Sequence, residues 1–178
     1  MHAAKRRMLW INALGGGAVL ASYAHGIASN PLTRGDVWGG VPDSLRPLYT
    51  VSMLAAAAGY FAFSYFVLFR LDPARTHIGN RFGFGAFNAL YGLILVPSAL
   101  WMPLTFAMLA NPSGELWWAI RATLGLVGIG SLGLVAALLA VQSPGATGAR
   151  WVAVLGSAAF CFQTAILDAL VWPAFFPV

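Results

Sequence analysis

The chain has 178 residues, of which 60% are hydrophobic and only 8% are charged. This composition excludes a soluble globular domain, because too few polar side chains are present to cover the surface of a protein of this size. The formal net charge of +5 does not indicate a nucleic-acid partner, since the positions of the basic residues indicate a membrane topology instead. We therefore expect an integral membrane protein.

Five apolar stretches are long enough to cross a hydrocarbon core about 30 Å thick, which takes about 20 helical residues. They cover residues 8–28, 48–70, 84–110, 116–142 and 150–172. The connections between them are too short for a soluble domain. The sequence therefore predicts an all-α, polytopic membrane protein, a five-transmembrane-helix bundle in which residues 1–178 form a single transmembrane domain.

The basic residues indicate how such a bundle is oriented. Seven of them lie on one side if the five helices alternate in direction: Lys5, Arg6, Arg7, Arg70, Arg75, Arg81 and Arg150. Because basic residues gather on the cytoplasmic side of membrane proteins, we expect the N-terminus to be cytoplasmic and the C-terminus to be outside. The expected location is the inner (plasma) membrane, as a multi-pass protein.

The first stretch contains three successive glycines, Gly15 to Gly17, which favour the close approach of another helix backbone. Near its outer end lie Tyr23 and His25. A lone histidine there is either an interfacial, hydrogen-bonded residue or a ligand-binding group. We include both side chains among the predicted pocket residues.

The third stretch is interrupted by Pro97 and Pro103, with Trp101 between them. A proline inside a helix lacks the N–H that would bond the carbonyl four residues earlier. In lipid such a carbonyl needs another partner. The pattern predicts a bent central helix with the two prolines as a hinge, and a kinked packing helix without a ligand explains it equally well.

The fourth and fifth stretches carry charged residues at membrane depth. Arg121 lies about 7 Å inside the start of its helix, at about 1.5 Å per residue. In the last stretch, polar residues recur at helical spacing along one face and end in an acid. They are Ser157, Cys161, Thr164 and Asp168. Such a face is expected to point into the bundle, and a charge at that depth counts as a candidate site.

Arg121 and Asp168 are expected at similar depth on the same side of the membrane, so they can pair. A structural salt bridge explains such a pair as well as a binding site does. If it is a site, helices 1, 3, 4 and 5 would enclose an outward-facing polar pocket. Its predicted lining residues are Arg121, Asp168, His25, Tyr23, Trp101, Thr164 and Gln163.

Residues for catalysis or metal binding are scarce. Cys161 is the single cysteine, so the chain can form neither an intrachain disulfide nor a cysteine-based metal cluster. Of the three histidines only His25 lies near membrane depth, which argues against a bis-histidine haem site. The sequence assigns no catalytic residues and no metal ligands, and it does not identify a cofactor.

The pattern of Ala89, Leu90, Tyr91, Leu100, Trp101, Pro103 and Phe106 in the third stretch, in a chain of five helices, resembles the tryptophan-rich sensory protein/translocator protein family. Members of that family bind porphyrins and sterol-like ligands, so the resemblance implies an intramembrane binding site. The chain lacks the family's proline- and tryptophan-rich first loop. It also has Asp168 where the family's last helix carries asparagine.

Three functions are compatible with these features. The first is the binding or transport of a small, partly apolar or anionic ligand in the outward-facing pocket, with Arg121 meeting an anionic group. The second is an accessory structural subunit of a larger membrane complex. The third is a lipid-modifying membrane enzyme with Asp168 and His25 as acid and base. The expected partners are the lipid bilayer, a hydrophobic small molecule, and further copies of the chain or a larger membrane complex.

Overall fold

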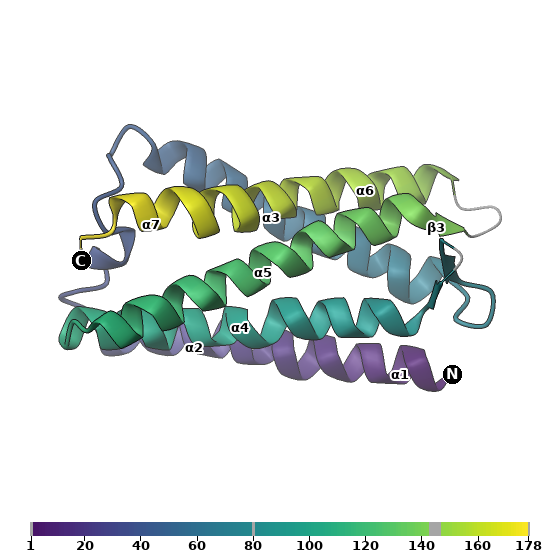
Figure 1. The fold of residues 1–178 in the computed structure, drawn as a ribbon, viewed down its shortest axis with the longest axis horizontal. Helices are drawn as coiled ribbons and strands as arrows, with labels where there is room; N and C mark the ends of the chain where they lie inside the picture. The colour runs from purple at the N-terminus through teal and green to yellow at the C-terminus, as the bar shows by residue number, and fades with distance from the viewer. Residues whose placement is uncertain (1, 80, 143–146, 178) are drawn as a thin grey trace.

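The computed structural model describes residues 2–79, 81–142 and 147–177, which form five long helices lying side by side along one axis (Figure 1). Helix 1 consists of α1 (Ala3–Trp10), the π-helical segment η1 (Ile11–Gly15) and α2 (Gly16–Ser29). The second combines α3 (Arg46–Tyr65) with the π-helical η3 (Phe66–Arg70), and the next two are α4 (Gly85–Ala110) and α5 (Gly114–Ala140). The last joins α6 (Thr147–Cys161), the π-helical η4 (Phe162–Val171) and α7 (Trp172–Phe175).

The connections contain a 3₁₀ turn, η2 (Asp36–Trp38), and three two-residue strands. The strands are β1 (His77–Ile78), β2 (Phe82–Gly83) and β3 (Val141–Gln142), paired antiparallel in the order β2-β1-β3. The two ends of the chain lie at opposite ends of the bundle, as Figure 1 shows. We call these the N-terminal end and the C-terminal end of the bundle.

The all-helical fold expected from the composition is confirmed. Four helices are long and apolar enough to cross a membrane, and they cover residues 46–70, 85–110, 114–140 and 148–175. Two of the predicted stretches end at Arg70 and Ala110, where the helices end. Helix 1 begins at Ala3, five residues before the predicted start, and is not among the four. Its glycines and polar side chains lower its mean hydropathy.

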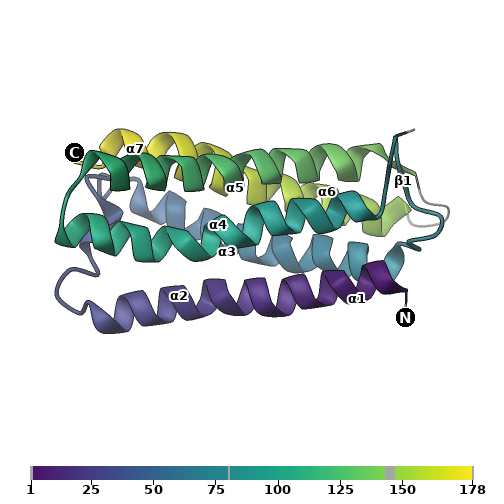
Figure 2. The same cartoon turned by 60° about the horizontal axis from the view of Figure 1, so that its bottom comes forward.

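The helices pack in the order helix 1, α4, α5, last helix, α3 (Figures 1 and 2). Polar side chains then connect α3 back to helix 1 and α4. The Tyr60 hydroxyl donates a hydrogen bond to Asn12 Oδ1 at 2.6 Å, and Ser64 Oγ lies 2.9 Å from the Tyr91 hydroxyl oxygen. Polar groups this deep in the bundle require such partners. These bonds therefore help to fix α3 against its neighbours.

Helices α3 and α6 approach each other closely. A Cβ added at Gly156 would lie 2.9 Å from the Cα of Gly59, and a Cβ added at Gly59 would overlap the Gly156 carbonyl. Small residues allow such backbone contact between membrane helices. In helix 1, Gly15 packs against Leu95, whereas a Cβ at Gly16 would meet nothing within 4 Å. The predicted role of the three glycines in close packing thus applies to the first of them.

Helix α4 continues through both prolines from Gly85 to Ala110. A hydroxyl one or two residues after each proline donates to a carbonyl of the preceding turn. Ser98 Oγ donates to the Ile94 carbonyl at 2.7 Å, and Thr105 Oγ1 donates to the Trp101 carbonyl at 2.9 Å. The hinge assigned to Pro97 and Pro103 remains a prediction.

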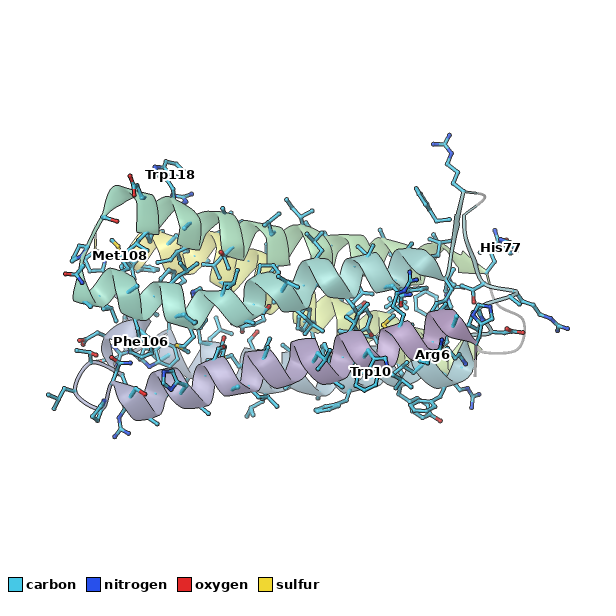
Figure 3. The ribbon with its side chains drawn as sticks, turned by 90° about the horizontal axis from the view of Figure 1, so that it is seen from below. Arg6, Trp10, His77, Phe106, Met108 and Trp118 are labelled. Atoms are coloured by element: carbon cyan, nitrogen blue, oxygen red, sulfur yellow. The ribbon has the colours of Figure 1, made fainter. Side chains whose placement is uncertain are left out.

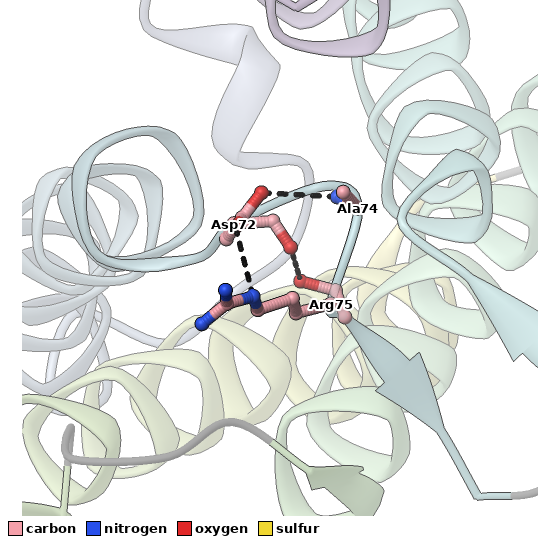
Figure 4. Close-up of polar contacts among 4 residues, drawn as sticks. Asp72, Ala74 and Arg75 are labelled. Atoms are coloured by element: carbon pink, nitrogen blue, oxygen red, sulfur yellow. Dashed lines mark hydrogen bonds and ion pairs between the residues drawn. The ribbon is translucent and has the colours of Figure 1, made fainter.

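The connection after η3 is held by Asp72, two residues after the end of the helix (Figure 4). Its carboxylate accepts a hydrogen bond from the Ala74 amide at 3.0 Å and lies 3.8 Å from Arg75 Nε. Its backbone carbonyl accepts from Thr76 Oγ1 at 2.6 Å. This turn leads the chain directly into strand β1 and so starts the small sheet.

Candidate functional site

An aromatic cluster closes the C-terminal end of the bundle. Its members come from η2, α3, α4, α5 and the end of the last helix: Trp38, Tyr49, Trp101, Trp117, Trp172 and Phe176. The ring centroids of Trp101 and Trp172 are 5.9 Å apart, and those of Trp172 and Phe176 are 4.6 Å apart. Aromatic pairs at these separations add to the stabilisation that burial provides.

The loop between helix 1 and α3 lies over this cluster and is bonded to the last helix. Trp172 Nε1 donates to the Val37 carbonyl at 2.9 Å, and the Gly40 amide donates to the Phe175 carbonyl at 2.9 Å. A Cβ at Gly40 would overlap that carbonyl, so the backbones meet directly. The loop is therefore an ordered cover over this end of the bundle.

Beneath the cluster, Gln163 and Asp168 form a hydrogen-bonded pair. Gln163 Nε2 donates to Asp168 Oδ1 at 2.7 Å. The two residues are five apart, and both lie in η4, the π-helical segment. A π-helix has hydrogen bonds between residues five apart, and its wider turn brings such positions closer together than an α-helix does. The local backbone therefore creates the pair.

Besides Arg46 Nε and Asn88 Oδ1, two buried polar atoms have no hydrogen-bond partner among the described residues. They are Gln163 Oε1, on a side chain that is 5% exposed, and Trp101 Nε1. An unpaired buried polar atom costs about 1–3 kcal/mol. One atom is an acceptor and the other a donor, so the site can hydrogen-bond a molecule that carries both kinds of group.

Two tyrosines border the same region. The ring of Tyr23 lies 5.6 Å from that of Trp101, and the Tyr49 hydroxyl donates to the Leu167 carbonyl at 2.9 Å. Leu167 directly precedes Asp168, and Trp101 also contacts the ring of Trp172, which follows Asp168 by four residues. Of the predicted pocket residues, the structure thus brings Asp168, Gln163, Trp101 and Tyr23 into one region. Tyr49 was not in the predicted set, although it falls on one side of its helix with Ser52 and Ser64, which is a usable signal in the sequence.

Thr164 is adjacent to this region, and its hydroxyl is already paired. It is 7% exposed, and its Oγ1 lies 2.9 Å from both Ser131 Oγ and the Phe160 carbonyl. Ser157, in the same stripe, is fully buried. The polar stripe of the last helix therefore points into the bundle, as its spacing predicts.

Arg121 does not pair with Asp168. Of the described residues, those that form ion pairs are Arg46 with Asp43 and Arg75 with Asp72. Arg121 is exposed, and its guanidinium lies 5.8 Å from the ring centroid of Trp117 and 5.5 Å from that of Trp118. Figure 3 shows Trp118 projecting away from the bundle. The expectation was based on depth alone, and depth does not say which way a helix face points.

His25 is also separated from the site. It is exposed, and its Nδ1 lies 3.3 Å from the Ser29 hydroxyl of the same helix. The adjacent Gly26 is buried, and a Cβ there would lie 2.7 Å from the Met102 side chain. Helix 1 therefore faces α4 through Gly26, and its histidine points elsewhere. The proposed acid–base set of His25 and Asp168 is not assembled in the structure.

The position of Arg121 gives a first testable consequence. Arg121→Ala is expected to change the free energy of unfolding by less than about 1 kcal/mol, because an exposed cation–π contact contributes about 0.5–1 kcal/mol. Reversible unfolding in detergent micelles measures this value. A loss of several kcal/mol would mean that Arg121 has a buried partner after all.

Two apolar grooves lie on either side of the exposed ridge of α4. One, of about 420 Å³, lies between α4 and α5 and includes Pro97 and Thr123. The other, of about 320 Å³, lies between helix 1 and α4 and includes Arg7. Neither groove includes Arg121 or Asp168. The Asp168 region is therefore distinct from both grooves.

The fold and the site define a helical-bundle protein with several apolar helices, as expected of a membrane-embedded protein, and a half-buried polar pair beneath an aromatic cluster. No protein-family model, curated protein or solved structure matches the chain. The resemblance of the third apolar stretch to the tryptophan-rich sensory protein/translocator protein family therefore gives no family assignment. Within the described residues, no group of three or more His, Cys, Asp or Glu side chains is placed to hold a metal ion.

Proposed function

We propose that this protein is a five-span membrane protein that binds or transports a small, partly apolar ligand at the Asp168–Gln163 pair. The observation that carries the proposal is the buried, unpaired Gln163 Oε1 close to a carboxylate, with the unpaired Trp101 Nε1 in the same half of the bundle. Buried polar atoms are normally satisfied. Unsatisfied ones beside a membrane-embedded acid indicate a functional site.

The chemistry of the site favours a ligand with a hydrogen-bond donor and an apolar body. Gln163 Oε1 and the Asp168 carboxylate accept hydrogen bonds, whereas Trp101 Nε1 donates one. The aromatic cluster suits an apolar body, and tryptophan faces also attract cations. The structure gives less support to an anionic ligand than the sequence does, because Arg121 lies over Trp117 and Trp118 instead of at the site.

In this proposal helix 1 also crosses the membrane, in addition to the four long apolar helices. The N-terminus is cytoplasmic and the site opens towards the outside. The basic residues at the N-terminal end of the bundle support this orientation through the positive-inside rule. The ordered loop between helix 1 and α3 then lies at the outer surface, over the aromatic cluster. Its release from the last helix would open the site.

The test compares Trp101→Phe with Trp118→Phe. The first change removes the unpaired N–H and keeps an aromatic ring, so it is expected to abolish ligand binding without loss of stability. The second removes an N–H from a ring that is 68% exposed and should change neither. Native mass spectrometry after purification in a mild detergent measures the bound small molecule, and an unfolding titration measures the stability.

Each outcome has a clear meaning. A small molecule that is retained by the parent chain and by Trp118→Phe, but lost from Trp101→Phe, supports the proposal. Equal retention by both variants contradicts it. Heavier chains that co-purify at fixed stoichiometry, with no small molecule, would replace it with the function of a subunit in a larger complex.

A further inference from the structure

The groove between helix 1 and α4 differs from the other groove because it has a cation at one end. Its wall on helix 1 is formed by Arg7, Trp10, Ile11 and Leu14, and its wall on α4 by Leu95 and Val96. Apart from Arg7 these side chains are apolar. The groove therefore has one charged end and an apolar trough.

The shape of the trough follows from two glycines. At Gly15 the helices touch, since a Cβ there would lie 2.9 Å from the Leu95 Cβ. At Gly92 a Cβ would meet nothing within 4 Å, so the absence of a side chain leaves space open between the helices. The groove thus ends at a tight contact near Gly15 and stays open from there towards Arg7.

The trough lies on the outer surface of the bundle. Trp10 is 61% exposed, Leu14 is 68% exposed and Val96 is 63% exposed. Trp10 lies beside Arg6 near the N-terminal end of the bundle in Figure 3. In a membrane protein these side chains contact lipid, and tryptophan is typical of the headgroup level. Arg7 is therefore at the membrane–water interface, and the trough extends into the hydrocarbon.

The length of the groove suits one acyl chain. From Arg7 to Gly15 helix 1 rises by about 12 Å, at about 1.5 Å per residue. The hydrocarbon of one leaflet is about 15 Å thick, half of a 30 Å core. An acyl chain lying in the trough from the level of Arg7 would therefore reach close to the bilayer midplane.

The charge at the open end selects an anion. Lys5, Arg6 and Arg7 are successive, and the sequence has no acidic residue before Asp36. Within the described part of the chain, the carboxylates that form ion pairs do so with Arg46 and Arg75, so Arg7 has no such partner. Basic pockets beside membrane helices bind anionic lipid headgroups, and each nearby Lys or Arg strengthens that attraction.

We propose that this groove is a binding site for an anionic phospholipid, with one acyl chain in the trough and the phosphate at Arg7. The site is separate from the Asp168 region, which lies towards the other end of the bundle. The test of this proposal does not depend on whether a ligand binds at Asp168.

The experiment uses the full chain in nanodiscs of phosphatidylcholine with about one fifth phosphatidylglycerol, followed by native mass spectrometry of the lipids that stay bound. The parent chain is expected to retain phosphatidylglycerol in preference to phosphatidylcholine. Arg7→Gln should reduce that preference about fivefold, as expected for the loss of one basic contact. Arg6→Gln removes the same charge from a residue outside the groove and should retain most of the preference.

A second variant tests the trough without changing any charge. Gly92→Leu fills the space and should also remove the bound phosphatidylglycerol, while circular dichroism confirms that the helices are retained. Equal losses in Arg7→Gln and Arg6→Gln would show a diffuse attraction to the membrane surface and overturn the proposal. Full retention by Gly92→Leu, or no preference in the parent chain, would also overturn it.

Discussion

Gly59→Ala is expected to lower the free energy of unfolding by about 3 kcal/mol, the upper part of the usual range for overpacking. The new Cβ would overlap the backbone carbonyl of Gly156, and its other near neighbours are also backbone atoms. A side chain can rotate away from such a clash, but a backbone cannot. Helices α3 and α6 would have to separate, which would weaken the packing of α3 on the rest of the bundle.

The matched control is Gly125→Ala in the middle of α5. A Cβ there meets nothing within 4 Å, so the change should be neutral or should stabilise the helix by up to about 1 kcal/mol. Both variants are measured by reversible unfolding in the same micelles. If Gly59→Ala were as stable as Gly125→Ala, the close contact between α3 and α6 would not exist in the folded protein.

Gln163→Leu is the second change with a large expected effect, a loss of about 2 kcal/mol, because removal of the unpaired Oε1 offsets part of the cost of leaving Asp168 without its donor. Gln163 supplies the hydrogen bond that Asp168 Oδ1 accepts at 2.7 Å. Leucine has a similar size but no donor, so the carboxyl would lose this partner inside the bundle. Leaving such a group unpaired costs about 1–3 kcal/mol, and more when it is charged.

A double-mutant cycle separates this effect from simple repacking. Gln163→Leu combined with Asp168→Leu removes both polar groups, and replacing a buried polar pair by apolar residues is often neutral or stabilising. The double variant should therefore recover most of the stability lost in Gln163→Leu. Additive losses in the two single variants would show that the two side chains do not interact.

The two predictions address different parts of the molecule and can fail separately. The contact between Gly59 and Gly156 concerns the packing of α3 on α6. The pair of Gln163 and Asp168 concerns a hydrogen bond within η4 of the last helix. A protein that is stable in the double variant but has lost its small molecule would link the polar pair to binding. Such a result would separate a role in function from a role in folding.

Much of the fold follows from the sequence alone. The scarcity of charged residues indicates a membrane protein, and apolar length predicts the helices, with ends at Arg70 and Ala110. The spacing of Ser157 and Thr164 also placed the polar face of the last helix correctly towards the interior, where both side chains are buried. These features are local, because they depend on composition and on the repeat of a single helix.

The candidate site could be predicted only in part, because it depends on directions that one helix does not determine. Depth along the membrane follows from counting residues, and it brought Arg121 and Asp168 to the same level. Rotation about the helix axis depends on which neighbours a helix packs against, and that rotation turns Arg121 outwards over Trp117 and Trp118. The hydrogen bond from Gln163 to Asp168 requires a π-helical turn, which a count based on 3.6 residues per turn does not reveal.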